Sequence, residues 1–188
     1  MIKRVLVIDA ITDLHLIDWT KVPTKQNVQI EFESLPDFSK YFETGNIQKA
    51  LENSKDTLQN RIQEFKPDLL VVHSKGVCLV TYLIVEKIYC GPAVILSPII
   101  NYCDHIKPVF EDDVDHFWER IGFILHTSGS KYAFGVGNSI DETELIFNDI
   151  QDMCHREEWP LLIFNGNHDW ILDEDCWEGI GSLIDMLI

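Results

Sequence analysis

The sequence lacks the cysteine spacing of a disulfide-stapled or zinc-binding protein. It has five cysteines, an odd number, and no two of them form a C-x-x-C pair. They are Cys78, Cys90, Cys103, Cys154 and Cys176. This pattern argues against a disulfide framework and against a structural zinc site. We therefore expect free thiols that are buried in the core, as is typical of a reducing compartment.

Long apolar runs are also absent. No stretch approaches the roughly 18 apolar residues that a membrane-spanning helix needs. The apolar run that follows Arg4 is broken at Asp9, so it is too short for the apolar region of a secretory signal. We therefore expect no membrane span and a cytoplasmic location.

Basic residues are scarce. The chain has 15 lysines and arginines against 31 aspartates and glutamates, which gives a formal net charge of -16 at pH 7. Such a charge repels phosphate backbones and anionic membrane surfaces, so we expect no nucleic-acid partner. The 188 residues suit a single domain spanning 1–188, and no repeat or low-complexity linker divides it.

The sequence does contain an alternation of short apolar runs and longer amphipathic stretches. The short runs predict strands at 4–8, 28–32, 69–72, 93–96, 132–136 and 161–164, with 28–32 at a sheet edge. The amphipathic stretches predict helices at 46–65, 76–89, 141–155 and 177–188, and one more inside 101–129. Continuous apolar strands are typical of a sheet covered on both faces. We therefore predict an α/β protein with three α/β/α layers and a mostly parallel sheet of about six strands.

A serine follows the predicted strand at 69–72, where the chain turns into a helix. Ligands of open parallel sheets bind at the carboxyl ends of the strands. A serine on a tight strand-to-helix turn has the geometry of a nucleophile elbow, so Ser74 is the candidate nucleophile. The backbone N–H of Lys75 would supply one half of an oxyanion hole. An N–H of Ile11 or one of its neighbours, after the first strand, would supply the other half.

An acid and a histidine follow the last two predicted strands. Asp141 comes after 132–136, and His168 comes after 161–164. The order serine, acid, histidine along the chain is the order used by α/β-hydrolases. Serine needs a base to take its proton, and a carboxylate fixes the tautomer of that base. The sequence therefore predicts a triad of Ser74, Asp141 and His168.

These motifs resemble those of the small single-domain serine hydrolases, the family that includes the retinoblastoma-binding serine hydrolase and its bacterial relatives. The likeness extends over nearly the whole chain and rests on V-H-S-K-G at 72–76, L-S-P at 96–98, G-N-S-I-D at 137–141 and G-N-H-D at 166–169. The resemblance implies a minimal α/β-hydrolase fold without a lid. It also implies hydrolysis of small esters or related acyl bonds without a cofactor.

One residue departs from the G-x-S-x-G pattern of that family, because Val72 stands where the first glycine would be. A β-branched side chain crowds a strained turn more than a glycine does. Two interpretations therefore stay open. The chain is a serine hydrolase acting on a small or medium acyl ester or thioester, or it is an inactive hydrolase fold that serves as a protein-interaction module.

A third interpretation involves metal ions. Asp13-Leu14-His15 looks like the D-x-H motif of calcineurin-like phosphoesterases, and 166–169 matches their G-N-H-D. The order fits poorly, since Ser74-Lys75-Gly76 stands where that family has a G-D motif. No histidine follows Asp169 either. We therefore predict no metal ligands and no cofactor.

Overall fold

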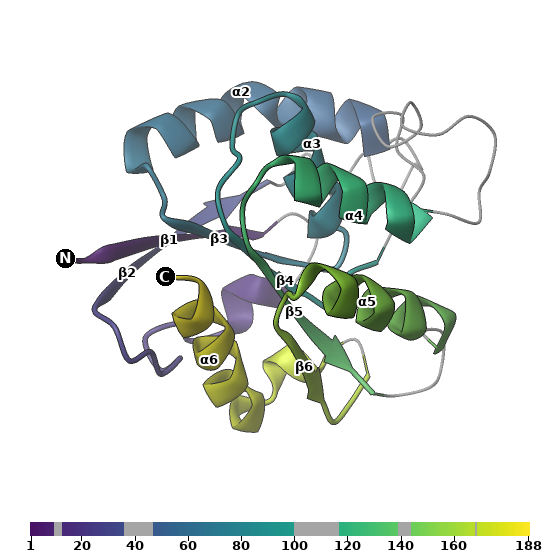
Figure 1. The fold of residues 1–188 in the computed structure, drawn as a ribbon. Coiled ribbons are helices and arrows are strands. Elements are labelled where there is room, and N and C mark those ends of the chain that lie inside the picture. Colours follow the sequence, from purple (N-terminus) through teal and green to yellow (C-terminus); the bar gives the residue numbers. More distant parts are fainter. Residues whose placement is uncertain (10–12, 36–46, 100–116, 139–143, 168) are drawn as a thin grey trace.

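The computed structural model describes residues 1–9, 13–35, 47–99, 117–138, 144–167 and 169–188 (Figure 1). The strands are β1 (Lys3–Asp9), β2 (Val28–Ser34), β3 (Leu69–His73), β4 (Ala93–Leu96), β5 (Tyr132–Gly137) and β6 (Leu161–Phe164). The α-helices are α2 (Ile47–Phe65), α3 (Gly76–Val85), α4 (Phe117–Thr127), α5 (Glu144–Glu157) and α6 (Trp177–Leu187). Short 3-10 helices are η1 (Asp13–Leu16), η4 (Trp170–Leu172) and η5 (Glu174–Cys176).

The six described strands form one parallel sheet in the order β2-β1-β3-β4-β5-β6. The predicted α/β class and parallel sheet are confirmed, and β2 lies at one edge as its alternating pattern predicted. Every residue of β3 and β4 is buried. Their continuous apolar runs therefore mark strands in the middle of a sheet that is covered on both faces.

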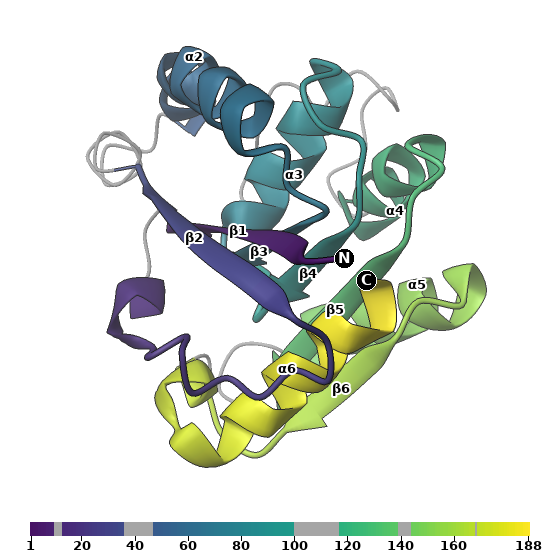
Figure 2. The same cartoon turned by 90° about the vertical axis from the view of Figure 1, so that its left-hand side faces the viewer.

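Helices lie on both sides of this sheet (Figures 1 and 2). Helices α2 to α5 pack on one face, while α6 and the short helices η1, η4 and η5 pack on the other. Successive side chains of β1 divide between the two cores: Leu6 and Ile8 enter the first, and Val5 and Val7 enter the second. This arrangement is compatible with three α/β/α layers.

Helix α2 follows the predicted range of 46–65 closely. Its buried residues Leu51, Leu58 and Ile62 recur at helical spacing and belong to the same core as residues of β1 and β3. The helix ends where Lys66 takes the left-handed conformation, with φ of 51°, directly before Pro67. Proline cannot continue a helix, so this boundary could be predicted from the sequence alone.

Helix α3 is shorter than predicted, because it ends at Val85 and not at residue 89. Lys87 has φ of 57°, which turns the chain back over the last turn of the helix. The N–H groups of Ile88 and Tyr89 then both donate to the carbonyl of Leu83, at 2.8 and 3.2 Å. Tyr89 is buried by this turn, and burial raises the pKa of its phenol well above the ordinary value.

The four described cysteines are free, as predicted, but they are not all buried. Cys78, Cys154 and Cys176 lie in the interior, whereas Cys90 is exposed in the turn between α3 and β4. Burial raises the pKa of Cys154 to about 12, so this thiol is an apolar packing group and not a nucleophile. Cys103 lies outside the described residues. None of the helices among the described residues is both long and apolar enough to span a bilayer.

Candidate active site

The strand order has its topological switch point between β1 and β3. Strand β2 lies on one side of β1, and β3 lies on its other side, so the connections leave β1 in opposite directions. In open α/β sheets, ligands bind outside the carboxyl ends of the strands at such a reversal. The turn that carries Ser74 directly follows β3 and therefore borders this position. Ile11 was predicted to line it from the β1 side, but it lies outside the described residues.

Ser74 occupies a strained turn between β3 and α3. Its φ is 55°, in the left-handed region that residues with a Cβ atom enter only at an energetic cost. Two backbone hydrogen bonds hold the turn: the N–H of Ser74 donates to Leu96 at 2.8 Å, and its carbonyl accepts from Ile99 at 3.1 Å. The strain is thus maintained by the next strand of the sheet. A serine in this conformation at this position has the backbone expected of a nucleophile elbow.

The turn accommodates Val72 because Gly76 has no side chain. A Cβ atom added at Gly76 would stand 2.6 Å from the Cβ of Val72, closer than two such atoms approach in proteins. Val72 itself is fully buried in the core on the helix α2 to α5 face. Positions 72 and 76, each two residues from Ser74, therefore lie against each other, and only one of them can carry a side chain. The departure from G-x-S-x-G is compatible with the turn for this reason.

Helix α3 begins directly after the serine. Its N-cap is Lys75, whose side chain makes no capping hydrogen bond. The first N–H groups of α3 and the positive end of its dipole therefore face the region of the turn. Such a helix start favours negative charge, which suits an oxyanion formed next to Ser74. The Lys75 side chain is half-buried, and this burial lowers the pKa of its ammonium group.

A second serine, Ser97, occupies the corresponding place at the end of β4. It has φ of 41° and is buried, and its N–H donates to Gly135 at 2.7 Å. Within the described residues, its Oγ has no hydrogen-bond partner. The sequence had drawn attention to L-S-P at 96–98 without giving this serine a role. Adjacent strands β3 and β4 are thus both followed directly by a serine in the left-handed conformation.

An aspartate–histidine pair lies at the end of β1, on the other side of Ser74. Asp9 is the last residue of β1 and is 8% exposed. Its Oδ2 lies 2.9 Å from Nδ1 of His15, which belongs to η1. Sequence reasoning considered His15 only as part of a metal motif and gave Asp9 no role. The interruption of an apolar strand by a carboxylate was the signal that could have identified it.

The ends of β5 and β6 are tied to each other by side-chain amides. Asn138 donates from Nδ2 to Oδ1 of Asn165 at 2.9 Å, and its own Oδ1 accepts from the N–H of Gly166 at 3.1 Å. These bonds fix the segment that leads to His168. Asp141 and His168 themselves lie outside the described residues. Their meeting with Ser74 therefore stays a prediction, supported by the convergence of β3, β5 and β6 at one sheet edge.

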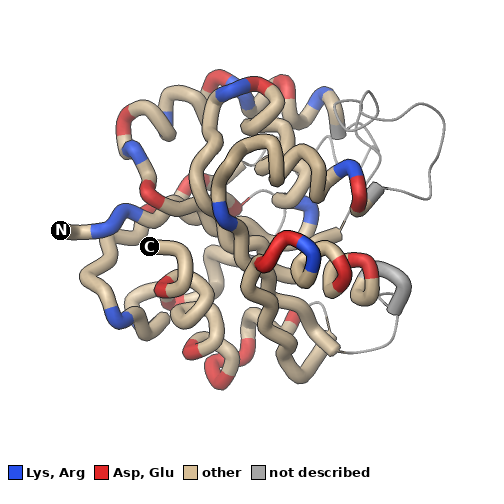
Figure 3. Tube along the Cα trace, in the orientation of Figure 1, with Lys and Arg blue, Asp and Glu red and all other residues tan. Residues whose placement is uncertain are grey.

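Acidic residues follow one another closely beyond β6, on the segment that leads to α6 (Figure 3). Asp169, Asp173, Glu174 and Asp175 are all exposed there. Lys21, which follows η1, forms ion pairs with Asp18 and Glu174, each at 3.7 Å. Exposed pairs of this kind stabilise a fold little. The acidic group instead makes this side of the sheet edge unfavourable for anionic substrates.

The described residues contain no group of three or more histidine, cysteine, aspartate or glutamate side chains that could hold a metal ion. What they do contain, around the switch point between β1 and β3, is a serine with a left-handed backbone, a helix start and an Asp–His pair. Such an arrangement can carry out acyl transfer, provided that a base reaches Ser74. In comparisons of the sequence with protein-family models and with curated proteins, nothing matches.

Proposed function

We propose that the protein is a serine hydrolase that cleaves a small or medium acyl ester or thioester through an acyl-enzyme. The observation that carries this proposal is the conformation of Ser74. It is a non-glycine residue with φ of 55°, and it lies at the topological switch point between β1 and β3. Strain of this kind persists where the surrounding structure maintains it, and it gathers at active sites. We infer with it a minimal α/β-hydrolase fold without a lid.

The proposed reaction has two halves. In acylation, Ser74 Oγ attacks the carbonyl carbon while His168 takes the serine proton and then gives it to the departing alcohol or thiol. In deacylation, a water molecule attacks the acyl-enzyme, His168 takes a proton from it, and that proton returns to Ser74 as the acid leaves. Asp141 holds the imidazole in the tautomer that both halves require. No cofactor takes part.

Backbone N–H groups would stabilise the oxyanion that forms in both halves. The N–H of Lys75 follows the nucleophile directly, and the proposed second donor is the N–H of Ile11. Removal of one such donor in other serine hydrolases costs about 100-fold or more in kcat. The start of α3 adds a positive dipole end at the same place.

Pre-steady-state hydrolysis of p-nitrophenyl butanoate tests this proposal. We expect a burst of p-nitrophenol that approaches one equivalent per active site, because the acyl-enzyme forms faster than water removes it. Ser74→Ala should abolish the burst. Ser97→Ala is the matched control, since Ser97 is the neighbouring buried serine with a positive φ, and its variant should retain the burst.

Other outcomes would point to other functions. Turnover that survives in Ser74→Ala and stops when a chelator is added would indicate metal-dependent chemistry. A folded wild-type protein without any turnover would favour the inactive fold that serves as an interaction module. The fit of Val72 against Gly76 leaves the turn intact, and this observation favours the active form.

A further inference from the structure

Strand β6 forms one edge of the sheet, and among the described residues it pairs with β5 alone. The strand, Leu161–Phe164, is entirely apolar, and no charged residue occurs between 159 and 167. Ile163 is 51% exposed, and Leu161 and Leu162 are only partly buried. An uncharged edge strand of this kind is a template for pairing with another strand.

The opposite edge of the sheet differs in charge. Strand β2 carries Glu31 and Glu33, and both form ion pairs with Arg61 of α2, the second with Nε at 3.3 Å from Oε2 of Glu33. Charged side chains on an edge strand discourage the addition of a further strand, because that strand would have to desolvate them. Pairing of β2 of one copy with β6 of the next, which would give an open chain of molecules, is therefore disfavoured.

The backbone groups of β6 have directions that follow from its pairing with β5. The carbonyl of Pro160, directly before β6, accepts from the N–H of Phe134 at 2.8 Å. Backbone groups alternate in direction along a strand, so those of Leu162 also face β5. The N–H and C=O groups of Leu161 and Ile163 therefore point outward from the sheet edge.

This spacing of outward groups makes β6 complementary to a second copy of itself. When two β6 strands run antiparallel with Leu162 opposite Leu162, Leu161 of each strand lies opposite Ile163 of the other. Each such pair can exchange both of its backbone hydrogen bonds. Leu161 packs against the core on the α2 to α5 face, and Ile163 projects to the same face, so apolar side chains meet apolar side chains there.

A surface hollow lies beside the start of β6. It is lined by Trp159 and Leu161, together with α5 residues that include Gln151 and His155. In the antiparallel arrangement, Ile163 of the second copy lies next to Leu161, at the rim of this hollow. Its exposed apolar side chain then leaves water, which stabilises the pairing.

We propose that the protein forms a symmetric dimer by antiparallel pairing of β6 with β6 of a second copy, with Leu162 at the two-fold axis. A second copy fits because the added strand must be uncharged and apolar on both faces, and β6 itself has this pattern. Each copy has a formal net charge of -16, so repulsion should weaken the dimer at low salt. This inference goes beyond the proposed hydrolase function and does not depend on it.

Disulfide cross-linking tests the register of the pairing. All variants carry Cys90→Ser, which removes the exposed thiol among the described cysteines. We expect Leu162→Cys to form a disulfide between copies in air, because opposed residues that share no hydrogen bond have Cα atoms about 4.5 Å apart. Ile163→Cys is the matched control: it is more exposed, but its two copies would be diagonal neighbours about 7–8 Å apart, too far for a disulfide. Intact-mass analysis without reductant measures both, and Cys90→Ser alone gives the baseline.

Sedimentation equilibrium tests the dimer without any added thiol. We expect wild type to dimerise with a Kd in the micromolar range, since a short strand pair buries little surface, and with a lower Kd at high salt. Ile163→Lys places a charge against Leu161 of the second copy and should raise Kd by about tenfold or more. Urea unfolding of each variant shows that the proteins compared are folded.

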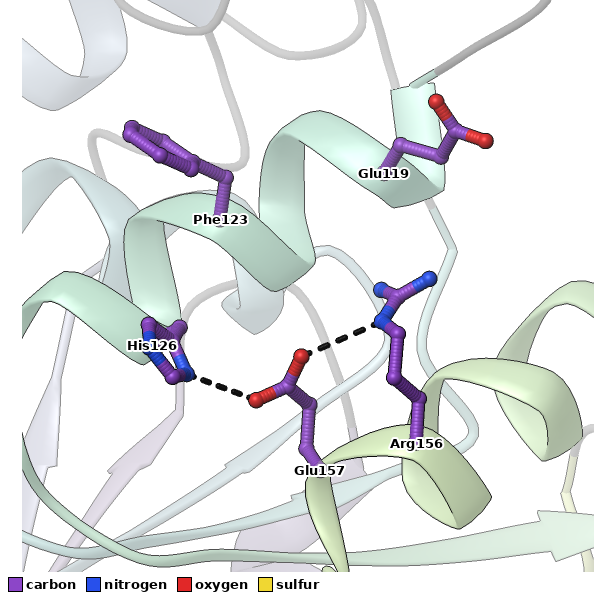
Figure 4. A pocket seen from close by; sticks show the side chains of 5 residues that line it. All are labelled: Glu119, Phe123, His126, Arg156 and Glu157. Carbon is purple, nitrogen blue, oxygen red and sulfur yellow. Dashed lines mark hydrogen bonds and ion pairs between the residues drawn. The ribbon is translucent and has the colours of Figure 1, made fainter.

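Phe123 supplies the matched surface control for Ile163→Lys. It is 50% exposed on α4, beside a pocket whose charged groups include an ion pair of Glu157 with His126 at 2.6 Å (Figure 4). Its exposure is thus nearly that of Ile163, but it belongs to a helix and not to a sheet edge. Phe123→Lys should therefore leave the Kd of the dimer within about twofold of wild type.

Three results would each overturn the proposal. The first is a wild-type protein that stays monomeric at about 1 mM in both low and high salt. The second is a disulfide that forms in Ile163→Cys and not in Leu162→Cys. The third is a dimer whose Kd is unchanged by Ile163→Lys, or is raised as much by Phe123→Lys, because its interface would then not be β6.

Discussion

Ser74→Ala and His168→Gln should each lower kcat for p-nitrophenyl butanoate by at least about 1,000-fold, and the double variant should be no slower than either single one. A nucleophile and its base act as a unit, so removal of either stops the same step. Steady-state kcat of the four proteins measures this directly. The residual rate in all three variants then reflects the oxyanion hole and substrate binding alone.

Unfolding in urea provides the control for these variants. Ser74→Ala removes only a hydroxyl from a turn, and His168→Gln exchanges one polar side chain for another, so we expect each to change the free energy of unfolding by no more than about 1 kcal/mol. Double-variant activity well below that of both singles would show that the two residues act independently. Unchanged kcat in His168→Gln would exclude this histidine as the base.

Trp170→Ala should lower the free energy of unfolding by about 3–5 kcal/mol, the range for loss of a large buried aromatic side chain. Trp170 is 3% exposed and stacks on Phe164 of β6, with ring centroids 3.8 Å apart and planes within 7°. It also packs against Gly135 and Gly137, where a Cβ atom would come within about 3.1 Å of the indole. Equilibrium urea unfolding measures the loss.

Trp170→Phe is the matched variant for this prediction. Within the described residues, Nε1 of Trp170 is buried without a hydrogen-bond partner, and such a group costs about 1–3 kcal/mol. Phenylalanine keeps the stacked ring and removes that N–H, so we expect a loss below about 1.5 kcal/mol. Equal losses in the two variants would show that the aromatic stack does not hold the segment after β6.

Most of the fold could be predicted because buried strands and helices have recognisable patterns of apolar residues. The apolar runs that became β3, β4 and β6 were bounded correctly or to within one residue, since sheet strands covered on both faces contain little else. The ends of the helices were harder to predict from the sequence. The true end of α3 depends on the left-handed Lys87 and on hydrogen bonds back to Leu83, and neither leaves a signal as clear as Pro67 does after α2.

The site could be predicted in part, for a similar reason. A serine between a buried strand and a helix can be found from local sequence, and Ser74 has the strained backbone that this prediction required. The positions of Ser97 and Asp9 beside Ser74 depend on which strands are neighbours. The order β2-β1-β3-β4 brings the ends of β1 and β4 to either side of Ser74, and no local pattern encodes that order. His15 required one further fact, its hydrogen bond to Asp9.

Labelling with a fluorophosphonate probe tests the central claim, that Ser74 is an activated nucleophile. The probe forms a bond to serine Oγ only where a base removes the proton, so intact-mass analysis of the folded protein reads activation without knowledge of the substrate. We expect one adduct on wild type and on Ser97→Ala, none on Ser74→Ala, and no effect of a chelator. A well-folded wild-type protein that takes up no probe, or one that is still labelled after Ser74→Ala, would contradict the account.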